Sequence, residues 1–296
     1  MTVAAAQLTA TLFPGQTMLG VEYGLVARVC LPDWIHDGEL GRPVEPLRAI
    51  SVRAMAASLG SAPESTRRHV HRLRDLGLLT ATAQGISLAT DPASETVVIR
   101  YYLGLHDLFI RLLEDIAATC DVDFAVAEDV SFGLADILER ALDTLLLPID
   151  TFRLEGMSRL AFLLWGALAT VAIRDITYDP VLSRKYADVI PPDASRKGIS
   201  LRPLAASMSI PYATAWRQLQ TLKESDLVAR LDNDRWTVLT RNLLNERARD
   251  TSGPPTLRLF GKVRELARMG LDPARATGLY RVGRPALADL GLSATG

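Results

Sequence analysis

Cysteine is scarce in this sequence, and its scarcity limits the kinds of protein that it can encode. Only two cysteines occur among 296 residues, Cys30 and Cys120, each in an apolar setting and far from the other. No disulfide framework is therefore expected. Two free thiols are typical of a reducing compartment, so we expect a cytoplasmic protein.

Patterns of catalytic and metal-binding residues are also missing. No glycine-rich loop has the spacing of a phosphate-binding site, and no His/Cys cluster has the spacing of metal ligands. His69 and His71 lie two residues apart on an expected helix and so point to different faces. His36 and His106 are isolated. We therefore expect no enzyme, no metal and no cofactor.

Long hydrophobic runs are absent as well. The longest, residues 160–173, lies between Arg159 and Arg174. It is shorter than the roughly 20 residues that a helix needs to span a bilayer. The N-terminal residues lack the charged start and apolar run of a secretory signal. No membrane partner is expected, and we interpret 160–173 as a buried or dimer-forming helix.

The charges that are present are segregated, although the net charge is only −1. Residues 48–74 carry six arginines and one acidic residue, whereas 114–155 carry eleven acidic residues and two arginines. Residues 241–284 carry ten basic residues and four acidic ones. Basic ends around an acidic middle are compatible with a local anion-binding face. Ordinary solvated helix faces remain an alternative, above all for the C-terminal run.

An internal repeat is the strongest pattern in the chain. Residues 50–79 read ISVRAMAASLGSAPESTRRHVHRLRDLGLL, and residues 199–228 read ISLRPLAASMSIPYATAWRQLQTLKESDLV. Nine positions are identical without a gap, among them Arg53 and Arg68, which match Arg202 and Arg217. A pattern that occurs only twice indicates a duplicated domain and not a solenoid.

The first copy contains the signals of two helices that are separated by a tight turn. Ser51 suits the N-cap of the first helix, and Gly60 offers the left-handed backbone that the turn needs. Pro63 suits the first position of the second helix, which Gly77 ends. Two short strands, the arms of a hairpin, are expected to follow at 78–82 and 86–88.

The same segment resembles a known DNA-binding motif. The pattern Ser-x-Arg-x-Met-Ala at 51–56, with Ser65-Thr66-Arg67 after it, resembles the signature of the GntR family of bacterial regulators. The second copy is more similar to MarR proteins, through 227–230 and 238–240. Pro63 and Gln84 stand where the GntR pattern often has Arg and His. The resemblance implies two winged helix-turn-helix domains whose second helices enter the DNA major groove.

Residues with DNA-binding chemistry occupy the expected reading helices. Arginine pairs bidentately with guanine and its charge attracts phosphate. By the resemblance, Arg53 and Arg67 match DNA-contacting arginines, and Ser65 stands where a contacting Thr is usual. The second copy has less positive charge, and an exposed Trp216 could stack on DNA or pack against a partner. The expected DNA contacts are Arg53, Glu64, Ser65, Thr66, Arg67, Arg68, His69, Arg72, Gln84, Arg202, Thr214, Trp216, Arg217, Gln218, Lys223 and Arg235.

The rest of the chain is predicted to be mostly helical. Residues 1–12 are expected to be loosely held, and 21–30 to form a helix that ends before Pro32. A second wing is expected at 228–240, with a strand at 235–239. Apolar residues at helical spacing predict further helices at 105–116, 134–145, 152–173 and 257–269.

We therefore expect a mostly α-helical protein with two winged helix-turn-helix domains, each with a small β-hairpin wing. The expected domains are at 1–95 and 181–245, with a helical linker or dimerisation segment at 96–180 and a C-terminal helical tail at 246–296. The expected function is transcriptional regulation by reading double-stranded DNA, as a tandem pseudo-dimer or a homodimer. A small-molecule effector is not identified by the sequence.

Two alternatives stay open. One is a protein-interaction module, such as the tandem winged helices of chromosome-condensation accessory proteins. The other is a DNA binder that resembles plasmid replication initiators.

Overall fold

A computed structural model describes residues 1–13, 17–120, 122–128, 130–149, 157–186, 189–244, 246–288 and 290. It is mostly α-helical, as the sequence predicts, and its few strands form small antiparallel sheets.

The first copy of the repeat folds as two helices, a turn and a hairpin. Ser51 caps the first helix, because its Oγ accepts a hydrogen bond of 3.1 Å from the Ala54 amide. Gly60 has a left-handed φ of 58°, and Pro63 begins the next helix. These local predictions are confirmed. The two helices are α3 (Val52–Leu59) and α4 (Pro63–Asp75), and the hairpin consists of β3 (Leu79–Thr82) and β4 (Gly85–Leu88). Three elements precede them, α2 (Gly20–Trp34), β1 (Ile35–His36) and β2 (Glu39–Leu40), and the long helix α5 (Pro92–Thr119) follows.

The second copy of the repeat also folds as two helices followed by a hairpin. The duplication extends to the strand pairing: Ile50 bridges Ile86 ahead of α3, and Ile199 pairs with Trp236 ahead of the corresponding helix. We call α2 to α5 the first unit and α8 to β7 the second unit. The elements of the second unit are α8 (Arg159–Tyr178), α9 (Pro180–Lys185), η2 (Asp193–Ser195), β5 (Ile199–Ser200), α10 (Leu201–Ser207), α11 (Tyr212–Glu224), β6 (Ala229–Arg230) and β7 (Arg235–Thr237).

Two expectations about the N-terminal residues were wrong. Residues expected to be loose form helix α1 (Thr2–Leu12), because Val3 and Ala5 are buried between the two units. Pro32 does not end its helix but lies within the last turn of α2. Burial of Leu31 and Trp34 on either side of the proline outweighs its cost to the helix.

The middle of the chain is shared between two hydrophobic cores. Helices α5 and α6 pack in the first core with the first unit and α13, whereas α8 packs in the second core with α10 and α11. The segment expected as a linker, 96–180, therefore contributes to both cores, and the boundary expected after residue 95 falls inside α5. The remaining elements are η1 (Thr17–Leu19), α6 (Leu134–Leu146), α12 (Thr240–Leu244), α13 (Glu246–Ala267) and η3 (Pro273–Leu279).

Helix α8 is the most apolar of the long helices. Within the part of the chain that the structure describes, it alone is long and apolar enough to cross a membrane by length and composition. In the fold, Leu164 and Leu168 of α8 are fully buried in the second core, and the helix packs on α11 and α1. This is the environment of a core helix.

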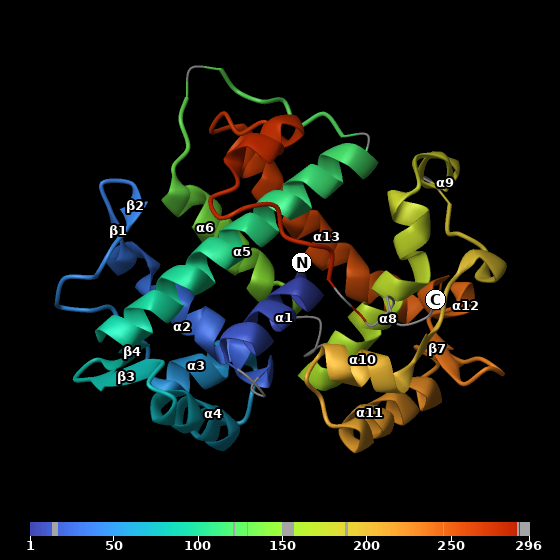
Figure 1. Cartoon of the computed structure of the whole chain (residues 1–296), viewed down its shortest axis with the longest axis horizontal. Coiled ribbons are helices and arrows are strands. Elements are labelled where there is room, and N and C mark those ends of the chain that lie inside the picture. Colours follow the sequence, from blue (N-terminus) through green and yellow to red (C-terminus); the bar gives the residue numbers. More distant parts are fainter. Residues whose placement is uncertain are drawn as a thin grey trace.

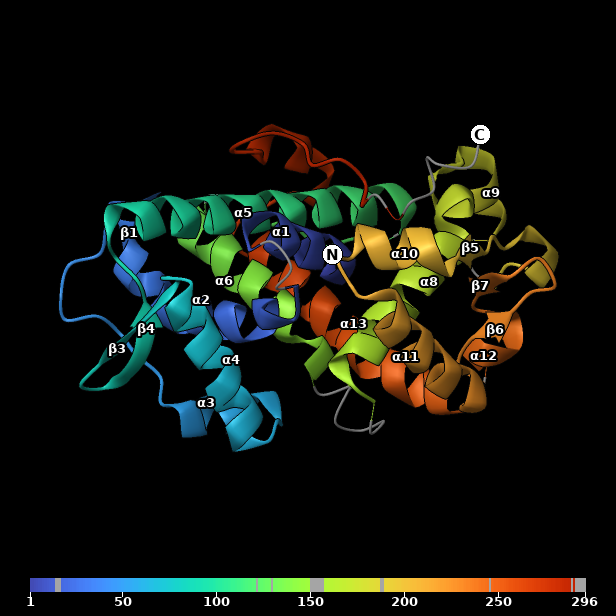
Figure 2. The ribbon, with the colours of Figure 1, turned by 60° about the horizontal axis from the view of Figure 1, so that its bottom comes forward.

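The two units lie side by side, with α1 between them (Figure 1). Helix α1 contacts both α5 and α8, and Gln7 Nε2 donates a hydrogen bond of 3.3 Å to the Ser207 carbonyl in α10. Helices α4 and α11 lie at the same edge of the molecule, the lower edge in Figure 1, and Figure 2 brings that edge forward. The second helix of each copy thus lies at the same edge of the molecule.

Candidate nucleic-acid interface

Helix α4 separates its residues into an inner and an outer face. Thr66, Val70 and Leu73 are buried at helical spacing and hold the helix against the first core. The opposite face is open to solvent and carries most of the charge of the helix. Its exposed residues are Glu64, Arg67, Arg68, His71, Arg72, Arg74 and Asp75.

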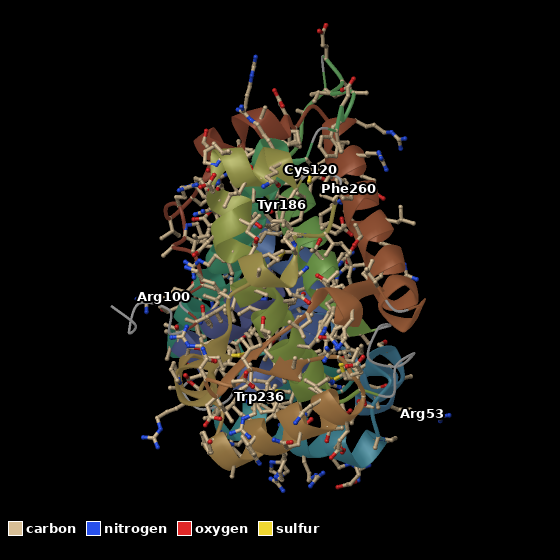
Figure 3. The ribbon with its side chains drawn as sticks, turned by 90° about the vertical axis from the view of Figure 1, so that its right-hand side faces the viewer. Arg53, Arg100, Cys120, Tyr186, Trp236 and Phe260 are labelled. Carbon is tan, nitrogen blue, oxygen red and sulfur yellow. The ribbon has the colours of Figure 1, made fainter. Side chains whose placement is uncertain are left out.

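Three exposed arginines at or near this face have no partner. Arg53 on α3 and Arg72 and Arg74 on α4 form neither a hydrogen bond nor an ion pair through their side chains with any described residue. Figure 3 shows Arg53 pointing outward near the edge that carries α4 and α11. An unpaired guanidinium is ready to bind phosphate or guanine without first breaking an internal contact.

The other expected contacts on α4 have weak internal partners. Arg67 Nη1 lies 3.7 Å from Glu64 Oε2, and both side chains are about 70% exposed. Arg68 Nη2 donates a long hydrogen bond of 3.4 Å to Ser65 Oγ. Such exposed contacts contribute little stability, so a ligand can replace them at small cost.

The turn of the β3–β4 hairpin carries an exposed Gln84. Gly85 follows it with a φ of 142°, and a Cβ there would lie 2.7 Å from the carbonyl group of Ile50. Only glycine lets β4 approach the chain ahead of α3 so closely. The hairpin is therefore held close to the start of α3.

Thr66 and His69, both expected as DNA contacts, have partners inside the protein. Thr66 is fully buried, and its Oγ1 lies 2.6 Å from Ser61 Oγ, so it lies outside the open face of α4. His69 Nδ1 lies 2.7 Å from Oε1 of Glu22, a fully buried carboxylate in α2, although 37% of the His69 side chain is exposed. Both side chains hold α4 in place.

The second unit offers fewer cations to a ligand. Arg202, Arg217 and Lys223 are exposed and form no ion pair with any residue that the structure describes. Thr214 and Arg235 are half-buried. The open face of α11 thus carries two cations, and α10 adds a third.

Trp216 is not the exposed side chain that the sequence suggested. It is half-buried, and its ring packs edge-on against Trp236 with centroids 5.8 Å apart. The guanidinium of Arg230 covers the Trp216 ring at 5.1 Å and also pairs with Asp234 at 2.7 Å. Asp232 adds a second exposed carboxylate to this wing, which makes the wing a poor phosphate contact.

Gln218 occupies the position in α11 that His69 occupies in α4, and it too is half-buried. Its Oε1 accepts a hydrogen bond of 2.6 Å from Ser158 Oγ, the N-cap of α8. The next residue, Arg159, donates a hydrogen bond of 2.6 Å to Glu22 Oε1. These contacts, joined through the backbone of Ser158 and Arg159, connect α4 to α11. We call His69, Glu22, Arg159, Ser158 and Gln218 the junction chain.

Glu22 is the central charge of the junction chain. Burial alone would raise its pKa, but the hydrogen bond from His69 and the charge of Arg159 outweigh burial and hold the pKa below its usual value. The carboxylate is therefore ionised at neutral pH, although its side chain is 1% exposed.

Sequence reasoning did not single out Glu22 or Arg159. The available signal was an acid within the otherwise apolar stretch 20–27, since a buried carboxylate requires a cationic partner. A contact of His69 with the protein interior could also have been inferred, because it lies beside Val70 and three residues after Thr66 on the buried face.

Comparison with protein families, with curated proteins and with solved structures finds no match for this chain. Among the described residues, no group of three or more His, Cys, Asp or Glu side chains could hold a metal ion.

Proposed function

We propose that the protein is a transcriptional regulator that binds double-stranded DNA through two winged helix-turn-helix units, with α4 as the principal reading helix. The observation that carries the proposal is the open face of α4, where Arg72, together with Arg53 of α3, is exposed and unpaired. The resemblance of residues 51–79 to bacterial regulators supports the same conclusion.

The chemistry of the open face matches the geometry of a DNA groove. A helix enters a major groove about 12 Å wide, and the residues near its N-terminus reach the base edges. Glu64, Ser65 and Arg68 lie in the first two turns of α4, so we expect them to contact bases. We expect Arg72, near the C-terminal end of α4, and Arg53, on α3, to contact phosphates.

The tandem arrangement implies two unequal half-sites. Helices α4 and α11 lie at one edge of the molecule, as in a dimeric regulator (Figure 1). Their open faces differ, since the positions of Arg67 and Arg72 are taken by Trp216 and Thr221 in the second copy. The preferred DNA is therefore expected to lack exact twofold symmetry.

Selection from a random pool of DNA duplexes tests this proposal without knowledge of the natural site. The full chain should enrich a defined sequence, and the double variant Arg53→Ala/Arg72→Ala should bind the enriched duplex at least about tenfold more weakly in a mobility-shift assay. Arg100→Ala is the matched control, because Arg100 is exposed and unpaired but lies away from Arg53 in Figure 3. Absence of enrichment, or equal loss in the control, would refute the proposal.

Protein docking is a second candidate for the second unit alone. The stacked Arg230 and Trp216, together with the acidic wing at Asp232 and Asp234, favour a protein surface over phosphate. Pull-down from nuclease-treated extract, with Trp216→Ala as the comparison, separates docking from DNA binding. A replication initiator would use the same face of α4, and genome-wide mapping of bound DNA would distinguish an origin from promoters.

A further inference from the structure

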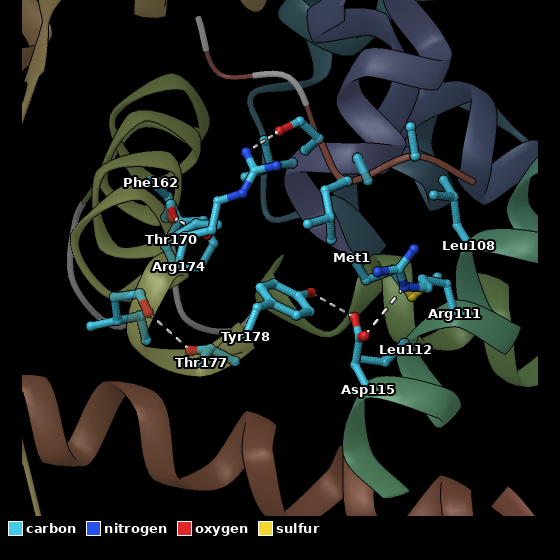
Figure 4. Close-up of a pocket in the computed structure, with 17 residues that line it drawn as sticks. Met1, Leu108, Arg111, Leu112, Asp115, Phe162, Thr170, Arg174, Thr177 and Tyr178 are labelled. Carbon is cyan, nitrogen blue, oxygen red and sulfur yellow. Dashed lines mark hydrogen bonds and ion pairs between the residues drawn. The ribbon is translucent and has the colours of Figure 1, made fainter. Parts of the chain in front are cut away.

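A cavity of about 370 Å³ lies between α1, α5, α8 and residues 286–288 of the C-terminal segment (Figure 4). This volume is within the range of roughly 300–1,000 Å³ that is typical of small-molecule sites. In Figure 4, α8 forms one side of the cavity and α5 the other. The cavity thus lies where the two units meet.

The walls of the cavity are mainly apolar. Leu108 and Leu112 of α5 face Phe162 and Ile173 of α8 across it, with Leu287 from the C-terminal segment. Apolar walls of this kind favour a ligand with a hydrocarbon or aromatic body.

Among the side chains that line the cavity, Arg174 has no carboxylate partner. Arg111 Nε binds Asp115 Oδ1 at 3.2 Å, and Tyr178 donates a hydrogen bond of 2.9 Å to the other oxygen of Asp115. The single carboxylate is therefore fully engaged. Arg174 Nη1 donates a hydrogen bond of 3.0 Å to the Ala288 carbonyl, and Arg174 forms no ion pair with any described residue.

A glycine in the middle of α8 keeps the cavity open. Gly166 lines the wall, and a Cβ built there would meet no atom within 4 Å. Glycine within a helix is less stable than alanine, and no crowding requires it at this position. The choice of glycine at this position therefore leaves space in the cavity that a larger side chain would occupy.

We propose that this cavity binds a small monocarboxylate with an apolar body. The carboxylate pairs with Arg174, whose planar guanidinium suits a carboxylate, and the body lies against Phe162 and the leucines of α5. A neutral ligand of the same shape would leave the charge of Arg174 uncompensated. A ligand cation finds no free carboxylate here, because Asp115 already has two partners.

The position of the cavity also implies a consequence for DNA binding. A ligand that bridges α5 and α8 contacts both units and can change the relative position of α4 and α11. This consequence rests on the proposed function, whereas binding of the ligand does not. The test below is therefore made without DNA.

Isothermal titration calorimetry of the full chain with octanoate, decanoate and benzoate tests the assignment. We expect at least one of these acids to bind saturably at one site per chain. Decanol should bind at least about tenfold more weakly than decanoate, and Arg174→Gln should weaken binding of the acid by a similar factor.

Gly166→Leu supplies the decisive variant, because it places a branched side chain in the wall of the cavity at a position where an added Cβ meets no atom within 4 Å. It should abolish binding, whereas Gly166→Ala, which adds one methyl group, keeps the fold and serves as its control. If none of the three acids binds, or if Gly166→Leu and Arg174→Gln bind as the wild type does, the assignment is overturned. Addition of the binding acid to the DNA mobility-shift assay then tests the coupling by itself.

Discussion

Arg159 at the start of α8 donates a hydrogen bond of 2.6 Å to Glu22 near the start of α2. These are the first helices of the two units, so the contact joins one unit to the other. Through His69 and Gln218 the junction chain reaches both α4 and α11. We therefore expect the relative position of α4 and α11 to depend on a buried carboxylate that each unit helps to satisfy.

The first prediction concerns the loss of this contact. Arg159→Met leaves the buried Glu22 carboxylate with His69 as its remaining partner, so the free energy of unfolding should fall by about 3 kcal/mol. Urea denaturation measures this change. In the double variant Glu22→Gln/Arg159→Met, the loss should be clearly smaller than the sum of the two single losses. Additive losses would show that the two side chains do not interact.

The second prediction concerns acid stability. The pKa of Glu22 and that of Asp107 are both held low in the folded chain. Burial acts against this shift at Asp107, but backbone amides at Arg281, Val282 and Gly283 and a hydrogen bond with His106 outweigh it.

A carboxylate whose pKa is lower in the folded state contributes stability above its unfolded pKa and loses it as pH falls through the folded value. Stability should therefore decline below about pH 4, where an unfolded carboxyl takes up its proton first. Denaturation at a series of pH values measures the decline. The Asp107→Asn variant should be less stable than the wild type at neutral pH and should lose less stability on acidification. If its stability fell with pH as steeply as that of the wild type, Asp107 would not be a cause of the decline.

The third prediction contrasts two glycines. Gly60 has a left-handed φ of 58°, so Gly60→Ala should destabilise the fold by about 1 kcal/mol. Gly166 lies inside α8 with open space around it, so Gly166→Ala should stabilise the fold by up to about 1 kcal/mol. Thermal denaturation of both variants should show shifts of opposite sign. Shifts of equal sign would mean that one of the two backbone environments is misassigned.

The fourth prediction separates binding from stability on α4. Arg72→Ala should weaken DNA binding while changing the free energy of unfolding by less than about 0.5 kcal/mol, because its side chain is exposed and unpaired. Thr66→Val should leave DNA affinity unchanged but lower the free energy of unfolding by about 1 kcal/mol, because the hydroxyl of Ser61 loses its buried partner. Parallel measurement of affinity and denaturation on the two variants decides whether the inner and outer faces are assigned correctly.

Local signals predicted the local structure of the first unit. A capping serine, a left-handed glycine and a proline at a helix start each act within a few residues, and Ser51, Gly60 and Pro63 behave as their chemistry dictates. Pro32 is the exception, because burial of its neighbours, which is set by the tertiary fold, outweighs a local preference.

Contacts between distant parts of the chain were not accessible to the same reasoning. Glu22 and Arg159 are 137 residues apart, and nothing in the sequence of either segment indicates that the two side chains are in contact. Trp216 could be recognised as replacing an arginine, but its packing on Trp236 and under Arg230 depends on how the second hairpin folds back. The cavity beside Arg174 likewise exists only after α1, α5 and α8 are assembled.

The salt dependence of DNA affinity tests the central claim most directly. Fluorescence anisotropy with the selected duplex, at salt concentrations from roughly 50 to 200 mM, gives the slope of log K against log salt. We predict a steep negative slope for the wild type that becomes shallower by about one for each phosphate contact removed in Arg53→Ala and Arg72→Ala. Arg100→Ala should retain the wild-type slope. A flat slope in the wild type, or identical slopes in all four proteins, would contradict DNA binding through the open face of α4.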